Sequence, residues 1–267
     1  MPATAEDGPA SDGEGAASTP RRAPFAPDFP EVVIQQPWDS PARPKAHTDY
    51  AAAKAGDTDA AFRFVQDMLR ADKLDDVRAM IGNSEPVIVA VHAEEATGRN
   101  KIPLVYAAVL GDALGLPVDE EIVQANRPQR RGRSNLYRLL HPVEFDGAVL
   151  PGRTCLLVDD HVSQGGTLAD LRSYIAGRGG KVVGATTLTG IPGGQILAPL
   201  AHTLDAVRRK LPGIDAYWKE TFGHDIAGLT EQETRYLLRF NALDSLRNQL
   251  VAGGQAARHR PDQGTPG

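Results

Sequence analysis

Residues 155–168 read Cys-Leu-Leu-Val-Asp-Asp-His-Val-Ser-Gln-Gly-Gly-Thr-Leu. The first four residues form a short apolar run, which is typical of a buried strand in a parallel sheet. The run ends at two carboxylates, Asp159 and Asp160, and two glycines then precede an apolar helical pattern. Ligands bind at the carboxyl ends of strands in open α/β sheets. The stretch therefore predicts both a fold class and the position of a site.

Strands and helices alternate around this stretch. Apolar runs predict strands, and helical periodicity predicts helices between them. The predicted strands cover residues 86–91, 116–123, 154–158 and 181–188, and the helices between them cover 102–114 and 167–175. This alternation predicts an α/β fold with a doubly wound, mainly parallel, Rossmann-like sheet.

Helical additions and tails are expected around this core. Asp57 is a predicted helix N-cap, followed by an apolar helical face, and Thr230 with Glu233 forms a predicted capping box. Nine of the 20 prolines lie at or before Pro44, which favours disorder there, although the apolar residues 31–34 suit a short added strand. The predicted parts are a disordered tail (1–45), an N-terminal helical cap (46–84), the α/β core (85–198), a C-terminal helical segment (199–251) and a disordered tail (252–267).

The composition excludes several classes of protein. The net charge of −5 does not favour a nucleic-acid-binding domain, which needs a basic face. A single cysteine, Cys155, excludes an intramolecular disulfide framework. The chain has neither an apolar run long enough to span a membrane nor an apolar signal segment at its start. We therefore expect a cytoplasmic protein with no membrane and no nucleic-acid partner.

The turn after the two carboxylates is suited to a sugar phosphate. Backbone N–H groups at a helix N-terminus bind phosphate, and Gly165 and Gly166 permit a close approach of the backbone. Ser163 and Thr167 add hydroxyl donors. The carboxylates of Asp159 and Asp160 can accept hydrogen bonds from a ribose diol.

This segment resembles the phosphoribosyl-pyrophosphate (PRPP) loop of type I phosphoribosyltransferases. The resemblance implies that Asp159 and Asp160 bind the ribose as catalytic residues. It implies that the 5′-phosphate is held by the residues of the following loop, Ser163, Gln164, Gly165, Gly166 and Thr167. His161 stands at a usually apolar position of the family pattern, and Gln164 replaces a small hydroxyl residue. The resemblance covers about residues 85–190.

The resemblance also implies a cationic diphosphate site and a metal. The loop after the first core strand supplies Arg99 and Lys101, and a basic stretch at the position of the family's catalytic loop supplies Arg130, Arg131 and Arg133. For each group a solvated charged loop is an equal alternative. Mg²⁺ is expected to arrive with the PRPP oxygens, with no directly assigned protein ligand.

The implied function is transfer of 5-phosphoribosyl from PRPP to a nitrogenous base, with release of pyrophosphate. Hypoxanthine, adenine, orotate and uracil all remain open as acceptors. The alternatives are a non-catalytic PRPP or nucleotide sensor of the same fold, an interaction protein that keeps the loop as a relic, and a hydrolase. Dimers are common for this fold, so a homodimer also remains open.

Overall fold

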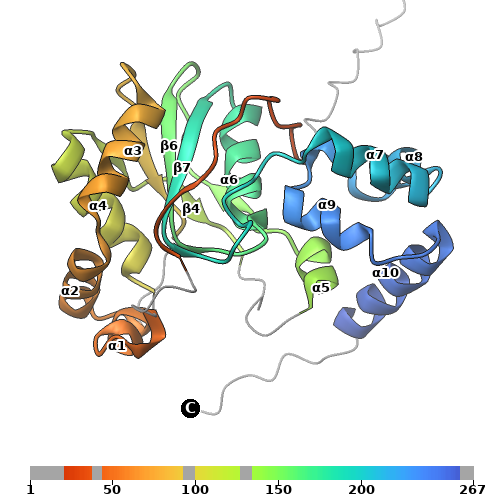
Figure 1. The fold of residues 1–267 in the computed structure, drawn as a ribbon, viewed down its shortest axis with the longest axis horizontal. Coiled ribbons are helices and arrows are strands. Elements are labelled where there is room, and N and C mark those ends of the chain that lie inside the picture. Colours follow the sequence, from red (N-terminus) through yellow and green to blue (C-terminus); the bar gives the residue numbers. More distant parts are fainter. Residues whose placement is uncertain (1–20, 38–43, 93–99, 127–133, 259–267) are drawn as a thin grey trace, which may run out of the picture.

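A computed structural model describes residues 21–37, 44–92, 100–126 and 134–258 (Figure 1). The strands are β1 (Val33–Pro37), β2 (Val87–Ala90), β3 (Val118–Asp119), β4 (Val123–Gln124), β5 (Phe145–Asp146), β6 (Thr154–Val162) and β7 (Lys181–Gly190). The helices are α1 (Tyr50–Ala55), α2 (Thr58–Met68), α3 (Ala71–Ile81), α4 (Ile102–Leu114), α5 (Asn135–Leu140), α6 (Gly166–Gly177), α7 (Ala201–Lys210), α8 (Ile214–Phe222), α9 (Glu231–Leu237) and α10 (Leu243–Arg258). Short 3₁₀ helices occupy Pro44–Ala46 and Ile226–Gly228.

A five-stranded sheet forms the centre of the fold, in the order β1-β7-β6-β2-β3. All of its neighbouring strands pair in parallel. Successive side chains of each strand point to opposite sides of the sheet. Both faces therefore carry apolar residues, and helices cover both of them. The predicted α/β fold with a mainly parallel sheet is confirmed.

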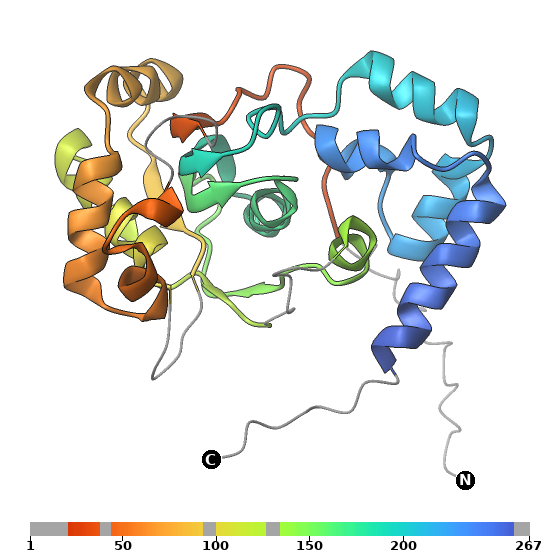
Figure 2. The same cartoon turned by 60° about the horizontal axis from the view of Figure 1, so that its bottom comes forward.

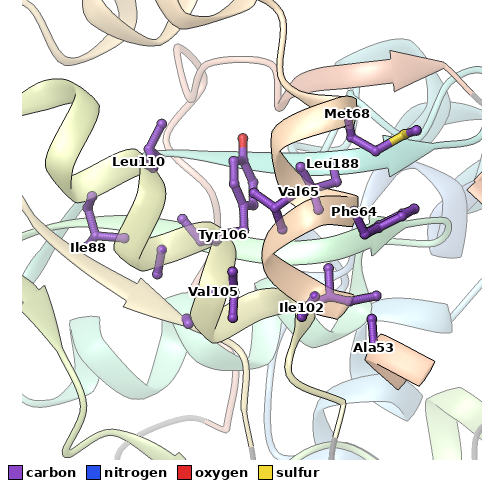
Figure 3. Packing of buried hydrophobic residues seen from close by; sticks show 14 of the residues in the cluster. Ala53, Phe64, Val65, Met68, Ile88, Ile102, Val105, Tyr106, Leu110 and Leu188 are labelled. Carbon is purple, nitrogen blue, oxygen red and sulfur yellow. The ribbon is translucent and has the colours of Figure 1, made fainter. Parts of the chain in front are cut away.

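Two apolar clusters hold helices against the sheet. On one face, Ile88 and Leu156 pack with α1, α2 and α4, including Phe64 and Tyr106 (Figure 3). On the other face, Leu157 and its neighbours pack against α6. Successive residues of β2 and β6 thus belong to the two clusters in turn. This explains why their sequences are continuously apolar, since both faces of the sheet are covered.

Two helix starts follow the predicted capping signals. Asp57 accepts a hydrogen bond from the N–H of Ala60 at 2.9 Å, ahead of α2. Thr230 and Glu233 form the capping box of α9.

The prediction of a strand over residues 116–123 is wrong in extent. Asp119 accepts hydrogen bonds from the N–H groups of Glu121 and Ile122 and so turns the chain.

The sheet gains an edge strand from the segment predicted as the N-terminal tail. β1 pairs with β7, with Val33 opposite Thr186. Residues 21–37 therefore have a defined place in the fold, and the prediction of a disordered segment over 1–45 does not hold for them. It also fails for residues 252–258, which continue α10. Residues 21–37 are held in place by polar contacts of Arg22 with residues far away in the sequence. No local sequence pattern predicts such contacts.

The C-terminal helices form a third apolar cluster beside the sheet (Figure 2). Trp218, Leu211 and Leu237 are its buried centre, and α5 contributes Leu136 and Leu139. In the described part of the chain, none of the helices combines the length and the apolar character that a membrane crossing requires.

A buried histidine beside this cluster, His224, makes the stability of the fold depend on pH. His224 is 3% exposed and burial lowers its pKa to about 4, against about 6.5 in an unfolded chain. Between these values the folded state binds fewer protons than the unfolded state, so the free energy of unfolding falls as the pH falls. We expect this group to cost about 2–3 kcal/mol between pH 7 and pH 4.5.

Urea unfolding of the wild type and of His224→Gln at both pH values measures this effect. The variant should lose less stability on acidification than the wild type by that amount. The exposed His202 offers a matched control, since His202→Gln should keep the wild-type pH dependence. Equal acid sensitivity of wild type and His224→Gln would contradict the prediction.

Candidate functional site

Strand β6 carries the two predicted catalytic carboxylates near its end. It is longer than predicted, because β7 continues beside it and pairs Asp159 with Thr187. The backbone N–H of Asp160 donates to Oδ1 of Asp159 at 2.8 Å. The two side chains are thus fixed on paired backbone and not on a loop.

Asp160 is held by two side chains from other elements. Nζ of Lys54, on α1, donates to Oδ2 of Asp160, and Nδ2 of Asn100 donates to the same oxygen at 2.8 Å. The Asp160 side chain is 13% exposed. Burial opposes its charge, but the ammonium of Lys54 and the hydrogen bonds from Lys54 and Asn100 together lower the pKa of Asp160.

Asp159 has the opposite electrostatic setting. Burial, and then the negative charge of Asp160, raise the pKa of Asp159 well above its ordinary value. Two adjacent carboxylates in one site are driven apart in this way. The pair therefore combines a firmly ionised group with one that takes up a proton more readily, while Asp160 in turn raises the pKa of Lys54 against the effect of burial.

His161 belongs to a short hydrogen-bond chain at the same edge. Oγ1 of Thr189, on β7, donates to the carbonyl of Asp160 at 2.9 Å, and Nδ1 of His161 lies 2.9 Å from that hydroxyl. The hydroxyl proton is used on the carbonyl, so Nδ1 of His161 is the donor to Thr189. Burial lowers the pKa of His161, which favours the neutral ring.

The loop between β6 and α6 holds the predicted phosphate-binding residues. Gly165 has φ +77°, in the left-handed region, and α6 begins at Gly166. Nη1 of Arg138, on α5, donates to Oγ of Ser163 at 3.2 Å. Since α5 precedes β6 in the chain, the structure brings an arginine from before this strand to the loop after it.

The two glycines have a second structural reason. A Cβ at Gly165 would collide with Leu197, and one at Gly166 would lie 2.5 Å from Oε1 of Glu233. Oγ1 of Thr230 donates to the carbonyl of Gln164 at 2.5 Å. The C-terminal part of the chain therefore packs closely against the loop, and positions 165 and 166 leave no room for a side chain.

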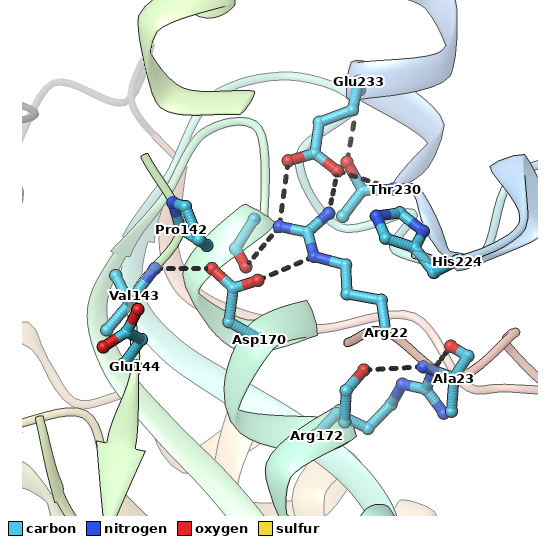
Figure 4. Close-up of polar contacts among 12 residues, drawn as sticks. Arg22, Ala23, Pro142, Val143, Glu144, Asp170, Arg172, His224, Thr230 and Glu233 are labelled. Carbon is cyan, nitrogen blue, oxygen red and sulfur yellow. Dashed lines mark hydrogen bonds and ion pairs between the residues drawn. The ribbon is translucent and has the colours of Figure 1, made fainter. Parts of the chain in front are cut away.

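A buried ion network fixes these helices to the loop (Figure 4). Nε of Arg22 donates to Asp170 on α6 at 2.7 Å, and Nη1 donates to Glu233 on α9 at 2.6 Å. Nη2 of Arg22 donates to the carbonyl of Gly166 at 3.1 Å. Both acids outweigh burial and raise the pKa of Arg22, so one charged side chain from the N-terminal segment ties α6, α9 and the loop together.

These elements surround a cavity of about 1210 Å³. Asp159, Asp160 and residues 163–167 line it together, as do Lys54 and Tyr50 from α1. An exposed face of α9 lines the same cavity. The carboxylates and the loop thus open into one space, with walls from both helical additions.

The predicted diphosphate-binding residues are not brought together by the described structure. Lys101 is the N-cap of α4, and its N–H donates to the carbonyl of Ala53 at 3.2 Å. Its side chain is not among the described residues that line the cavity. Arg99, Arg130, Arg131 and Arg133 lie outside the described residues.

Sequence reasoning did not find Lys54, Arg22 or the lining face of α9. Lys54 lies 106 residues from Asp160 along the chain, and no local pattern links the two. The α9 face, which continues into the turn after the helix, could have been found in the sequence. Its residues Gln232, Arg235, Tyr236 and Arg239 have helical spacing.

Comparisons with known proteins show similarity in sequence over most of the chain. No protein-family model matches it. "Protein TraN" of Escherichia coli is 39% identical over 244 residues, which make up 91% of this chain and 54% of TraN. An uncharacterized protein of Haemophilus influenzae is 36% identical over 154 residues, 58% of this chain and 34% of that protein. This chain therefore spans about half or less of the length of these two relatives.

A third relative carries an enzyme name. An adenine phosphoribosyltransferase of Lactobacillus acidophilus is 29% identical over 156 residues, which make up 53% of this chain and 82% of that protein. Among solved structures, an adenine phosphoribosyltransferase overlaps 48% of this chain and 69% of its own, with 17% identity and a TM-score of 0.32. A UMP synthase of Leishmania donovani overlaps 66% of this chain and 32% of its own, with 14% identity and a TM-score of 0.28.

Proposed function

We propose that this chain is a PRPP-dependent phosphoribosyltransferase. The observation that carries the proposal is that Asp159, Asp160 and the loop at residues 163–167 line one cavity at the carboxyl end of a central parallel strand. Such an edge is where ligands bind in this class of sheet. The sequence similarity to an adenine phosphoribosyltransferase over 53% of the chain supports the same reading.

The residues have distinct parts in the proposed reaction. The N-terminus of α6, with Ser163, Thr167 and Arg138, binds the 5′-phosphate. Asp159 and Asp160 accept hydrogen bonds from the ribose hydroxyls. Their negative charge favours the cationic ribose that forms as C1 separates from its leaving group.

The reaction exchanges one bond at C1 for another. The C1–O bond to diphosphate breaks, and its electron pair leaves on the diphosphate oxygen. The acceptor nitrogen donates its lone pair to C1, and a proton on that nitrogen passes to a base. Asp160, ionised beside Lys54, is suited to stabilise the charge at C1, and Asp159, whose pKa is raised, is suited to take up that proton.

We propose that Mg²⁺ binds in this site mainly through oxygens of the substrate. Among the described residues, no three His, Cys, Asp or Glu side chains form a metal cluster, while Asp159 and Asp160 offer the oxygen ligands that Mg²⁺ prefers. When bound with the diphosphate, the ion would neutralise its charge. Lys101, Arg99, Arg130, Arg131 and Arg133 remain proposed donors to the same diphosphate.

The acceptor is proposed to bind against the N-terminal helices. Lys54 contacts Asp160, and Tyr50 and Lys45 line the cavity on the same side. An aromatic ring and two cationic groups are suited to a planar nitrogenous base that accepts hydrogen bonds. This supports α1 as the wall that reads the acceptor.

Titration calorimetry with PRPP, with and without Mg²⁺, tests the site. We expect micromolar binding of PRPP that Mg²⁺ strengthens, and weaker binding of ribose 5-phosphate, because only PRPP presents the diphosphate. A panel of bases with PRPP, read by pyrophosphate release, then identifies the acceptor. Absence of binding of both compounds would contradict the proposed site.

The second candidate is a PRPP or nucleotide sensor without turnover. The contact of Lys54 and Asn100 with Asp160 favours it, since the second carboxylate is already engaged by side chains of the protein. A sensor would bind PRPP and leave it intact in the presence of every base in the panel. Pyrophosphate release with any base would remove this alternative.

A further inference from the structure

The cavity does not end at the phosphate loop. One face of α9, together with the turn that follows the helix, continues its wall, and its four members have the spacing i, i+3, i+4 and i+7. They are Gln232, Arg235, Tyr236 and Arg239. From Gln232 to Arg239 this face is about 10 Å long, and the contact between Thr230 and Gln164 fixes its beginning against the loop.

The cationic groups of this face are organised by their surroundings. Nε of Arg235 donates to Oε1 of Glu231 at 2.5 Å, and the Glu231 side chain is fully buried. Glu231 also accepts from the N–H of Leu200 and from Oγ1 of Thr203. The carboxylate therefore holds Arg235 through Nε, and its two Nη nitrogens are not used in that contact.

An aromatic ring accompanies the arginines. The guanidinium of Arg239 lies 5.6 Å from the ring centroid of Tyr236, and Tyr236 packs edge-on against Phe240 at 5.6 Å. Arg138 lines the cavity too and contacts Ser163 in the loop. The one acidic side chain of α9 that lines the cavity, Glu233, is neutralised by Arg22.

Two arginines and a tyrosine beside the phosphate loop are suited to a nucleoside that is joined to the bound ribose 5-phosphate through a second phosphate. Arginines bind phosphate oxygens in a two-pronged geometry, and a tyrosine beside them can stack on a base. In the proposed site the 5′-phosphate of PRPP would bind at the loop, and PRPP carries no group beyond that phosphate that would extend along the α9 face. We propose that this face is a binding subsite for ribose whose 5′-phosphate belongs to a diphosphate bridge to a nucleoside, as in ADP-ribose.

The inference goes beyond the proposed transfer reaction and rests on the same sugar-phosphate site. Its ribose 5-phosphate part occupies the loop and the Asp159–Asp160 pair. The second phosphate and the nucleoside extend along α9. The chain would thus bind two kinds of ribose phosphate, one confined to the loop and one that also reaches Arg235 and Arg239.

Calorimetric titration of the full chain with ADP-ribose and with ribose 5-phosphate tests the subsite. ADP-ribose should bind at least about tenfold more tightly, since one charge-assisted hydrogen bond corresponds to about a tenfold to hundredfold gain. Arg235→Gln with Arg239→Gln should remove that gain and leave the affinity for ribose 5-phosphate within about twofold. Arg239→Gln alone, a substitution at an exposed position, should remove part of it.

A matched control replaces two exposed arginines elsewhere, Arg208→Gln with Arg247→Gln. It should leave both affinities unchanged. Equal affinities of the two ligands for the wild type would overturn the subsite while leaving the proposed function intact. So would an equal loss of both ligands in the α9 variant. Failure of both ribose 5-phosphate and PRPP to bind at all would overturn both proposals.

Discussion

Replacing Asp159 and Asp160 together by asparagine is expected to lower phosphoribosyl transfer by about a thousandfold or more. Each carboxylate would accept a charge-assisted hydrogen bond from the ribose, which contributes about 1.5–3 kcal/mol, and the negative charge opposite C1 is also lost. Asparagine keeps the shape of the side chain and an oxygen that accepts the Asp160 N–H bond. The effect should therefore fall on the site and not on the fold.

Initial rates of pyrophosphate release, with a thermal unfolding curve beside them, measure this effect. Lys54 loses its anionic partner in the double variant, but its side chain is 33% exposed and water can replace that contact. The melting temperature should stay within a few degrees. Asp75→Asn with Asp76→Asn, on the surface of α3, changes the net charge equally and should keep the wild-type rate. Wild-type turnover in the Asp159–Asp160 variant would sink the site assignment.

Arg22→Met is expected to lower the free energy of unfolding by about 3–5 kcal/mol, because removing one partner of a buried ion network leaves uncompensated charge. The carboxylates of Asp170 and Glu233 have side chains that are 4% and 3% exposed. Arg22 also donates to the carbonyl of Gly166. The same substitution should therefore weaken the binding of ribose 5-phosphate at the loop.

Urea unfolding and calorimetric titration measure the two effects of Arg22→Met. Arg21→Met, at the exposed neighbouring position, serves as the matched control and should change stability by less than about 1 kcal/mol. Adding Asp170→Asn and Glu233→Gln to Arg22→Met removes both orphaned charges and should restore much of the stability. Wild-type stability of Arg22→Met would show that the network does not hold the loop.

The central part of the fold could be predicted because its signals are local. The apolar runs of β2 and β6, the Asp57 cap and the Thr230–Glu233 capping box each depend on residues close in sequence. The loop after β6 was found for the same reason. Its glycines were assigned to the approach of phosphate, whereas the structure adds a packing reason in Leu197 and Glu233.

The rest of the site depends on contacts between distant segments. Lys54 reaches Asp160 only because α1 packs beside the sheet edge, and Arg22 reaches α9 across 211 residues. The proline-rich composition predicted disorder near the N-terminus, whereas burial of Arg22 and the pairing of β1 with β7 hold residues 21–37 in place through distant contacts. Local propensity cannot show that kind of tertiary stabilisation.

The path of the Arg22 segment has a consequence for biosynthesis. Arg22 leaves the ribosome long before Glu233, so its guanidinium must wait for a carboxylate synthesised 211 residues later. Contacts between such distant residues form late and slow folding. Until Glu233 is made, Asp170 is the acid of this network that Arg22 can bind, so the network is incomplete. The segment that carries Arg22 and β1 therefore reaches its full set of contacts only after α9 has been synthesised.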